Sequence, residues 1–273
     1  MPPSPRLTPG ALPERPRVVA MGDSVIAGYG VGGVSYADTV GERLQAERVM
    51  SYARSTFTVE DSVRLLPRVL AFGPDVVIVN IGGADGLVHA GEAVERFLGR
   101  FAPKSWRGVE GLEPKPAQEK PPQEETGLLK LRFRVTGLIK LVLKHIGVRL
   151  TGGYRRVTPD RFEPAFEQVV ATLAEAGVTV VVVGLHAPDE WLWPRSTASG
   201  LEYEAAIARV LDRHPEALFV DPKPVLDRWG DFLSDHIHFN RRGHDKVAAL
   251  VWRALEPATA PAARPQVAAS PDE

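Results

Sequence analysis

Serine, histidine and aspartate stand near opposite ends of this sequence in an arrangement suited to nucleophilic catalysis. Ser24 follows Gly22 and Asp23, and two residues separate Asp235 from His238 near the other end. A serine hydroxyl is a weak nucleophile unless a base accepts its proton, and a histidine base needs an anion to orient its ring. The spacing of Asp235 and His238 lets one short turn present both side chains to the same point. We therefore expect Ser24 as nucleophile, His238 as base and then acid, and Asp235 as the orienting group.

Alternating strands and helices supply the frame that would position these residues. Short apolar runs rich in β-branched residues predict buried strands at 17–21, 75–80 and 178–183. Two weaker strands are expected at 49–53 and 217–220. Helical patterns cover 36–48, 61–71, 91–101, 159–176, 201–213 and 241–255. This alternation predicts an α/β fold, a three-layer sandwich whose parallel sheet is covered by helices on both faces. Ser24 would then lie at the carboxyl end of the sheet, where such folds carry their sites.

Composition narrows the class of protein. The 273 residues are 44% hydrophobic and 25% charged, as expected for one globular domain, and the net charge of −1 gives no reason to expect a nucleic-acid partner. The absence of cysteine excludes a thiol nucleophile and disulfides. The first 17 residues lack the apolar core of a secretory signal, and no apolar run reaches the roughly 18 residues of a membrane span. We expect a cytoplasmic protein, peripheral at any membrane it meets, without cofactor or metal.

At its first and last motifs the chain resembles the SGNH/GDSL hydrolases. Gly22-Asp23-Ser24 matches the first block of that family, and Asp235-x-x-His238 matches its last block. The resemblance extends from about residue 18 to 255, apart from an inserted segment. It implies a flavodoxin-like α/β fold and a serine esterase that acts on an O-acyl ester of a carbohydrate, a lipid or a small metabolite.

The middle blocks depart from the family pattern. Thr56 stands where the second block has a glycine whose backbone N–H helps to bind the oxyanion, and Ala84 replaces the asparagine of the third block, whose side chain is a further donor. The resemblance therefore implies an oxyanion hole formed by the N–H groups of Ser24 and Thr56. Removing one such donor costs roughly 10²–10³ in rate, so we expect a slow or specialised enzyme.

Three further residues of these blocks are expected to bind substrate, namely Asp23, Gly83 and Asp85. Two alternatives carry less weight. His236 and His238, with Asp235 or His244, could bind a metal ion, but such scattered ligands often occur by chance. The glycines at 28, 30 and 33 fit a dinucleotide fingerprint, yet the first comes well after the strand ends, so a loop beside Ser24 is the better interpretation.

An insertion at residues 102–158 interrupts the expected domain of residues 17–256. Residues 103–122 are rich in Pro, Lys and Glu, and 127–150 form a basic amphipathic pattern with a break expected at Gly137. Its apolar stripe comprises Leu128, Leu131, Val135, Leu138, Ile139, Val142 and Ile146, opposite Lys130, Arg134, Lys140 and Lys144. Either the stripe packs on the domain, or 126–158 form a lid that meets an anionic membrane surface or an acidic carrier protein. Residues 1–16 and 257–273 are expected to be disordered.

The sequence therefore predicts a serine esterase that forms an acyl-serine intermediate. Two other functions remain open. An acyltransferase would pass the acyl group to an alcohol acceptor, and the loss of the asparagine at Ala84 is compatible with a catalytically degenerate protein that binds carbohydrate or lipid.

Overall fold

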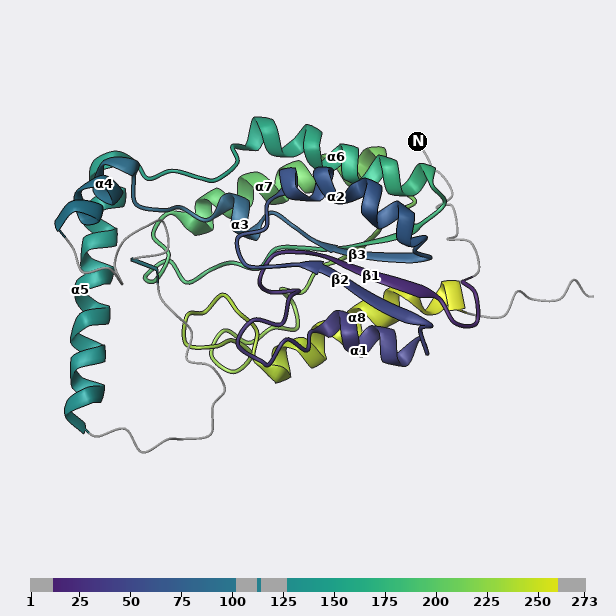
Figure 1. Cartoon of the computed structure of the whole chain (residues 1–273), viewed down its shortest axis with the longest axis horizontal. Coiled ribbons are helices and arrows are strands. Elements are labelled where there is room, and N and C mark those ends of the chain that lie inside the picture. Colours follow the sequence, from purple (N-terminus) through teal and green to yellow (C-terminus); the bar gives the residue numbers. More distant parts are fainter. Residues whose placement is uncertain (1–11, 102–111, 114–126, 260–273) are drawn as a thin grey trace, which may run out of the picture.

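A five-stranded parallel sheet forms the centre of the molecule. The computed structural model describes residues 12–101, 112–113 and 127–259 (Figure 1). The strands are β1 (Arg17–Gly22), β2 (Arg48–Ala53), β3 (Val76–Asn80), β4 (Thr179–Val183) and β5 (Leu218–Val220). Each strand predicted from the sequence is present, and the expected three-layer α/β sandwich is confirmed.

The order of the strands determines where a site can form. The sheet is ordered β2-β1-β3-β4-β5, and every adjacent pair is parallel. After β1 the chain moves outward to β2, and it then crosses back to β3 on the other side of β1. In an open α/β sheet, ligands bind outside the carboxyl ends of the strands at such a switch point. The residues that follow β1 and β3 are therefore the first candidates for a functional site.

Helices cover both faces of the sheet, as Figure 1 shows. The helices α2 (Val59–Phe72), α6 (Pro159–Glu175) and α7 (Ser196–Arg213) bury one face, and α1 (Tyr36–Arg43) and α8 (Arg241–Thr259) bury the other. Two of these helices begin with a capping box, formed by Ser35 with Asp38 and by Thr58 with Asp61, so polar residues fix their start points. The described chain exceeds both expected domain limits, because Leu12 packs against the core and α8 continues past residue 256.

The insertion contributes the helix α5 (Gly127–Thr151) at one end of the molecule, next to the helix α4 (Glu92–Phe101) that comes before it (Figure 1). Helix α4 packs on α5, with Leu98, Leu112 and Leu143 in a small apolar cluster between them. The break expected at Gly137 is wrong, because α5 is one continuous helix of 25 residues. Of the helices that the structure describes, none is both long and apolar enough to cross a lipid bilayer. The expected loop at 103–122 and both expected disordered ends fall mainly outside the described residues.

Candidate active site

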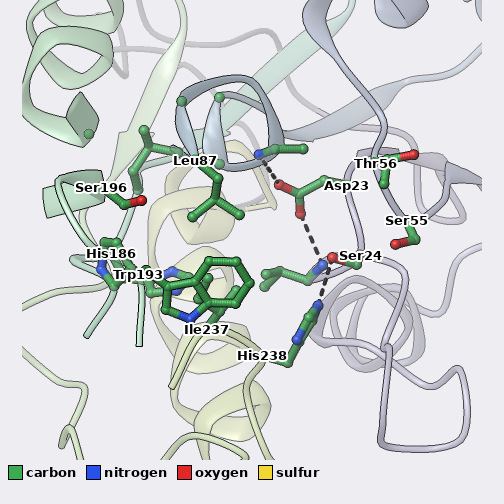
Figure 2. Close-up of a pocket in the computed structure, with 18 of the residues that line it drawn as sticks. Asp23, Ser24, Ser55, Thr56, Leu87, His186, Trp193, Ser196, Ile237 and His238 are labelled. Carbon is green, nitrogen blue, oxygen red and sulfur yellow. Dashed lines mark hydrogen bonds between the residues drawn. The ribbon is translucent and has the colours of Figure 1, made fainter. Parts of the chain in front are cut away.

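The three residues expected to carry catalysis meet in one hydrogen-bonded chain. Ser24 Oγ lies 2.7 Å from His238 Nε2, and His238 Nδ1 lies 2.5 Å from Asp235 Oδ2. Because a carboxylate only accepts hydrogen bonds, Nδ1 carries the proton and Nε2 is free to accept the proton of Ser24. Asp235 is buried, whereas Ser24 and His238 are half-buried beside a cavity (Figure 2). This is the arrangement of an activated serine nucleophile.

Ser24 reaches this position because the chain turns sharply after β1. Gly22 has a φ of 157°, and a Cβ at this residue would lie 2.1 Å from the carbonyl oxygen of Asn80 on β3. Only glycine allows the two strands to approach so closely at this point. The turn continues with an N–H···O bond from Ala27 to the carbonyl of Asp23. The Ser24 hydroxyl is thereby held over the carboxyl end of the sheet.

A turn between β5 and α8 presents the other two members. Both oxygens of Asp235 are used, because Oδ2 binds the His238 ring and Oδ1 accepts the backbone N–H groups of Ile237 and His238 at 3.1 Å. Trp193 Nε1 donates to the Asp235 carbonyl at 2.8 Å. The ring of Tyr29, from the glycine-rich loop, packs 4.8 Å from the imidazole of His238. These contacts fix the direction of the histidine before any substrate binds.

The cavity in front of Ser24 has a volume of about 170 Å³. The carboxyl ends of β1, β2, β3 and β4 all contribute to its wall. Its lining includes Asp23, Thr56, Ala84, Leu87, His89, Glu113, Leu185, His186, Trp193 and Ile237. The cavity therefore lies at the expected switch point and contains most of the residues proposed from the sequence.

Thr56, at the position where the resemblance implies a glycine, has a backbone conformation that is typical of glycine. Its φ is 62°, in the left-handed region that a β-branched residue rarely adopts. Such strain persists only where the surrounding structure imposes it, and it is common at functional sites. We infer that the backbone conformation of Thr56, rather than its side chain, is the functional feature of this position. Thr56 lines the cavity beside Ser24 (Figure 2), which is compatible with its expected role as a backbone donor.

Ala84 lines the cavity as well, but its side chain offers no hydrogen-bond donor. It belongs to the short helix α3 (Gly83–Gly86), which follows β3. Its backbone N–H donates to Asp23 Oδ2 at 3.1 Å. Asn80 does not replace the missing amide, because its Nδ2 donates to the carbonyl oxygen of Val183 on β4. Neither Ala84 nor Asn80 therefore offers a side-chain donor where the resemblance implies one.

Asp23 connects the first block to the third. Its Oδ1 accepts the N–H of Val25 at 3.0 Å, and its Oδ2 accepts the N–H of Ala84. Burial raises the pKa of this carboxyl, while these two bonds and the nearby His238 act in the opposite direction. Asp23 and Gly83 line the cavity, as expected for residues near the substrate. The bonds of Asp23 show that it also holds the serine turn against α3.

Asp85 was expected to bind substrate, but its side chain turns away from the cavity. It is fully buried, and its Oδ1 accepts the N–H of Val59 in the first turn of α2 at 3.0 Å. Its Oδ2 has no hydrogen-bond partner within the described chain. Burial raises the pKa of Asp85 to about 7, and the charge of Asp23 adds to the effect. The residue therefore stabilises the start of α2 at the cost of a buried, titratable carboxyl.

The raised pKa of Asp85 predicts a loss of stability as the pH increases. A carboxyl with a pKa of about 7 when folded and 3.8 when unfolded favours folding at low pH, and this contribution is lost as the pH rises through 7. Asp85→Asn retains the acceptor for Val59 and cannot ionise. Between about pH 5 and pH 8 we expect wild type to lose about 2–3 kcal/mol of unfolding free energy relative to this variant. Urea unfolding at both pH values measures the difference, and parallel pH profiles would contradict the assignment.

His236, adjacent to the catalytic aspartate, belongs to a second pair. Its Nδ1 lies 2.9 Å from Asp189 Oδ2, which also binds Arg228 at 2.7 Å. Burial opposes the ionisation of Asp189, but the bonds from His236 and Arg228 outweigh it and lower its pKa to about 2. His238 is directed to Ser24, and His244 Nδ1 accepts the N–H of Tyr36. The histidines of the proposed metal site therefore point to different partners.

The wall of the cavity opposite the serine turn contains a buried charge network that the sequence analysis missed. Lys144 of α5 is fully buried, forms an ion pair with Glu113, and places its Nζ 3.8 Å from the centre of the Trp193 ring. Glu113 also lies 2.9 Å from His89 Nδ1. Burial lowers the pKa of Lys144; it also disfavours ionised Glu113, but hydrogen bonding to His89 and the charge of Lys144 keep the pKa of Glu113 below its usual value.

This network reverses the expected orientation of the basic helix. Lys144 was expected opposite the apolar stripe, and it lies inside with Leu141 and Val148. The described part of the stripe, from Val135 to Ile146, is exposed. The sequence contains an indication that Lys144 is buried, because Lys144 shares a helical face with Leu141 and Val148. The partner of Lys144 could not be recognised from the sequence, since Glu113 is 31 residues away along the chain. The side chains of residues 127–134 lie outside the described part.

The fold and the site together define a three-layer α/β protein in which a serine, a histidine and an aspartate form one hydrogen-bonded chain. The profile of the GDSL-like lipase/acylhydrolase family matches residues 20–246, and the chain belongs to this family. It is therefore an ester-cleaving enzyme of the SGNH type. No curated protein matches the sequence significantly.

Several solved structures share the fold at low sequence identity. A lipolytic protein of the G-D-S-L family from Desulfitobacterium hafniense is 14% identical with a TM-score of 0.55, and the alignment covers 88% of this chain and 100% of that one. A catalytic mutant of Axe2, an acetylxylan esterase from Geobacillus stearothermophilus, is 15% identical with a TM-score of 0.54, covering 91% and 96%. The esterase EstA from Pseudoalteromonas is 12% identical with a TM-score of 0.52, covering 88% and 96%.

Proposed function

We propose that this enzyme hydrolyses a small O-acyl ester through an acyl-serine intermediate on Ser24. The observation that carries the proposal is the unbroken chain from Asp235 through His238 to Ser24 at the wall of a cavity. Each member has the partner that its chemical role requires. The orienting carboxylate is buried, and the nucleophile faces the open space.

The reaction follows from this geometry. His238 Nε2 accepts the proton of Ser24 as Oγ attacks the carbonyl carbon, and the charge of Asp235 stabilises the imidazolium that forms. The oxyanion is held by the backbone N–H groups of Ser24 and Thr56. When the intermediate collapses, the alcohol leaves with the proton from His238. Water, deprotonated by His238, then attacks the acyl group, the carboxylic acid departs, and Ser24 regains its proton.

The dimensions of the cavity favour a short acyl group. A cavity of about 150 Å³ accommodates a molecule of the size of benzene, and the cavity beside Ser24 has about 170 Å³. Apolar side chains form part of its lining, among them Leu185 and Ile237. An acetyl or similarly small group fits this space, whereas a long fatty acyl chain would have to extend beyond it.

One polar group favours a hydroxylated substrate. His89 donates from Nδ1 to Glu113, and its buried Nε2 has no hydrogen-bond partner within the described chain. A neutral imidazole nitrogen of this kind accepts a hydrogen bond. A hydroxyl of a carbohydrate or a small metabolite would supply the donor after a movement of the His89 side chain, which lines the cavity but keeps Nε2 covered. That one structural neighbour is described as an acetylxylan esterase agrees with this substrate class.

Ester turnover with product analysis tests both parts of the proposal. We expect kcat/KM for aryl acetate and butyrate to exceed that for aryl laurate, because the longer chain does not fit the cavity. We also expect acetylated sugars to release free acetate. If an added alcohol acquires the acyl group faster than water does, the enzyme is an acyltransferase. Equal turnover of long and short chains would contradict the assignment of the cavity.

A further inference from the structure

We propose that the outward face of α5 docks on an anionic lipid bilayer. This face, called the outer face below, consists of Val135, Leu138, Ile139, Val142, Ile146 and Leu150. Each of these side chains is between 45% and 78% exposed. At a rise of about 1.5 Å per residue they form a continuous apolar stripe roughly 22 Å long. An exposed apolar patch of this extent on a folded protein indicates an interaction surface.

The opposite face of α5 is already occupied, so the helix cannot simply rotate to bury the stripe. Lys144 is bound to Glu113 and stacks on Trp193, while Leu141 and Val148 are buried beside it. On the flank of the helix, His145 Nε2 lies 2.7 Å from the carbonyl of Trp191. Turning the outer face inward would expose the apolar side chains of the inner face and separate a buried ion pair, which is strongly unfavourable.

The charge of the segment selects the kind of surface that would cover the stripe. Residues 126–159 contain eight Lys or Arg residues and no Asp or Glu, although the whole chain has a net charge of −1. Two of the eight, Lys144 and Arg155, are paired with Glu113 and Glu202. Arg149 is exposed and lies between Ile146 and Leu150 along the helix. An apolar helical stripe in a segment with only cationic charges is typical of helices that lie in the interface of an anionic membrane.

A tryptophan at the border of the stripe favours lipid over a protein partner. Trp191 is 62% exposed, and its ring lies 5.1 Å from that of His145 on α5. Tryptophan prefers the boundary between lipid headgroups and acyl chains, where its ring is apolar and its N–H stays hydrated. The helix also stands at one end of the molecule, as Figure 1 shows, and can therefore approach an extended flat surface.

Sedimentation with lipid vesicles tests the proposal on the full-length enzyme. We expect binding to vesicles of phosphatidylglycerol and phosphatidylcholine at low salt, weaker binding at high salt, and little binding to phosphatidylcholine alone. Leu138→Glu should reduce binding by about tenfold or more, because it places a charge in the centre of the stripe. Leu201→Glu on α7 is the matched control, since Leu201 is 60% exposed and Leu138 is 56% exposed.

Turnover of a water-soluble aryl acetate shows whether each variant remains folded, and it should not change in Leu138→Glu. This measurement separates the docking proposal from the proposed function, because vesicle binding and ester cleavage can fail independently. The proposal is overturned if wild type does not bind anionic vesicles, or if Leu138→Glu binds them with the same affinity as wild type. It is also overturned if the stripe holds a second copy of the chain or an acidic carrier protein instead, detected as a dimer or a complex that Leu138→Glu abolishes.

Discussion

Ser24→Ala is expected to lower kcat/KM for a short-chain aryl ester by at least about 10⁴-fold, because His238 would then have no hydroxyl to activate. The fold should be unaffected, since the Ser24 side chain is half-buried and its hydrogen bond runs to His238. Steady-state kinetics of the purified variant measure the effect. Ser55→Ala is the control, because Ser55 lines the same cavity, and it should remain within about tenfold of wild type.

A fluorophosphonate probe gives an independent test of the same nucleophile. We expect it to add to Ser24 of wild type, located by peptide mass spectrometry, and not to Ser24→Ala. Equal hydrolysis by Ser24→Ala and wild type would exclude the mechanism. A wild-type protein that neither turns over esters nor reacts with the probe would instead be a degenerate member of the family that retains only a binding pocket.

Ala84→Asn is expected to raise kcat by about tenfold to a hundredfold. The substitution restores an amide donor at the position where the family has one, and such a donor acts mainly on the charge that develops in the transition state. KM should therefore change less than kcat. The side chain has room, because Ala84 borders the cavity beside Ser24.

Ala84→Leu is the matched control, since leucine has the same number and branching of side-chain heavy atoms as asparagine without a donor, and it should not increase kcat. If asparagine and leucine have the same effect, the change arises from packing rather than from oxyanion binding. An Ala84→Asn enzyme no faster than wild type would mean that the N–H groups of Ser24 and Thr56 already suffice. It would also mean that Ala84 is an adaptation of this site and not a deficiency.

The meeting of Ser24, His238 and Asp235 could be predicted from the sequence because it depends on residue type and on strand ends. Ser24 follows a strand whose apolar run is unmistakable, and the two-residue spacing of Asp235 and His238 is a local property. The role of Asp85 could not be predicted. Its partner is the backbone N–H of Val59, which no side-chain pattern reveals.

The strands of the fold could also be predicted from the sequence, whereas two details of the helices could not. Three strands were found because each is an apolar, β-branched run, and the weaker β2 and β5 were found because they complete the alternation of strands and helices. Helix α1, however, ends at Arg43, five residues before the expected limit. Gln45 has a φ of 50° and leads the chain into β2, a change of direction that the periodicity of the sequence does not show. Helix α3 was missed because four residues are too few to establish a helical period.

The buried position of Lys144 has a consequence for the architecture of the enzyme. Its ion pair with Glu113 and its contact with Trp193 join α5 to two residues that line the cavity. Through these two residues the inserted segment supports the wall of the cavity that we propose as the ester-binding site, so it is not an appendage to a finished domain. An enzyme shortened by this segment would retain the sheet and the contacts of Ser24 with His238, but one side of its substrate cavity would open to water. The insertion and the cavity beside Ser24 are thus parts of one packed structure.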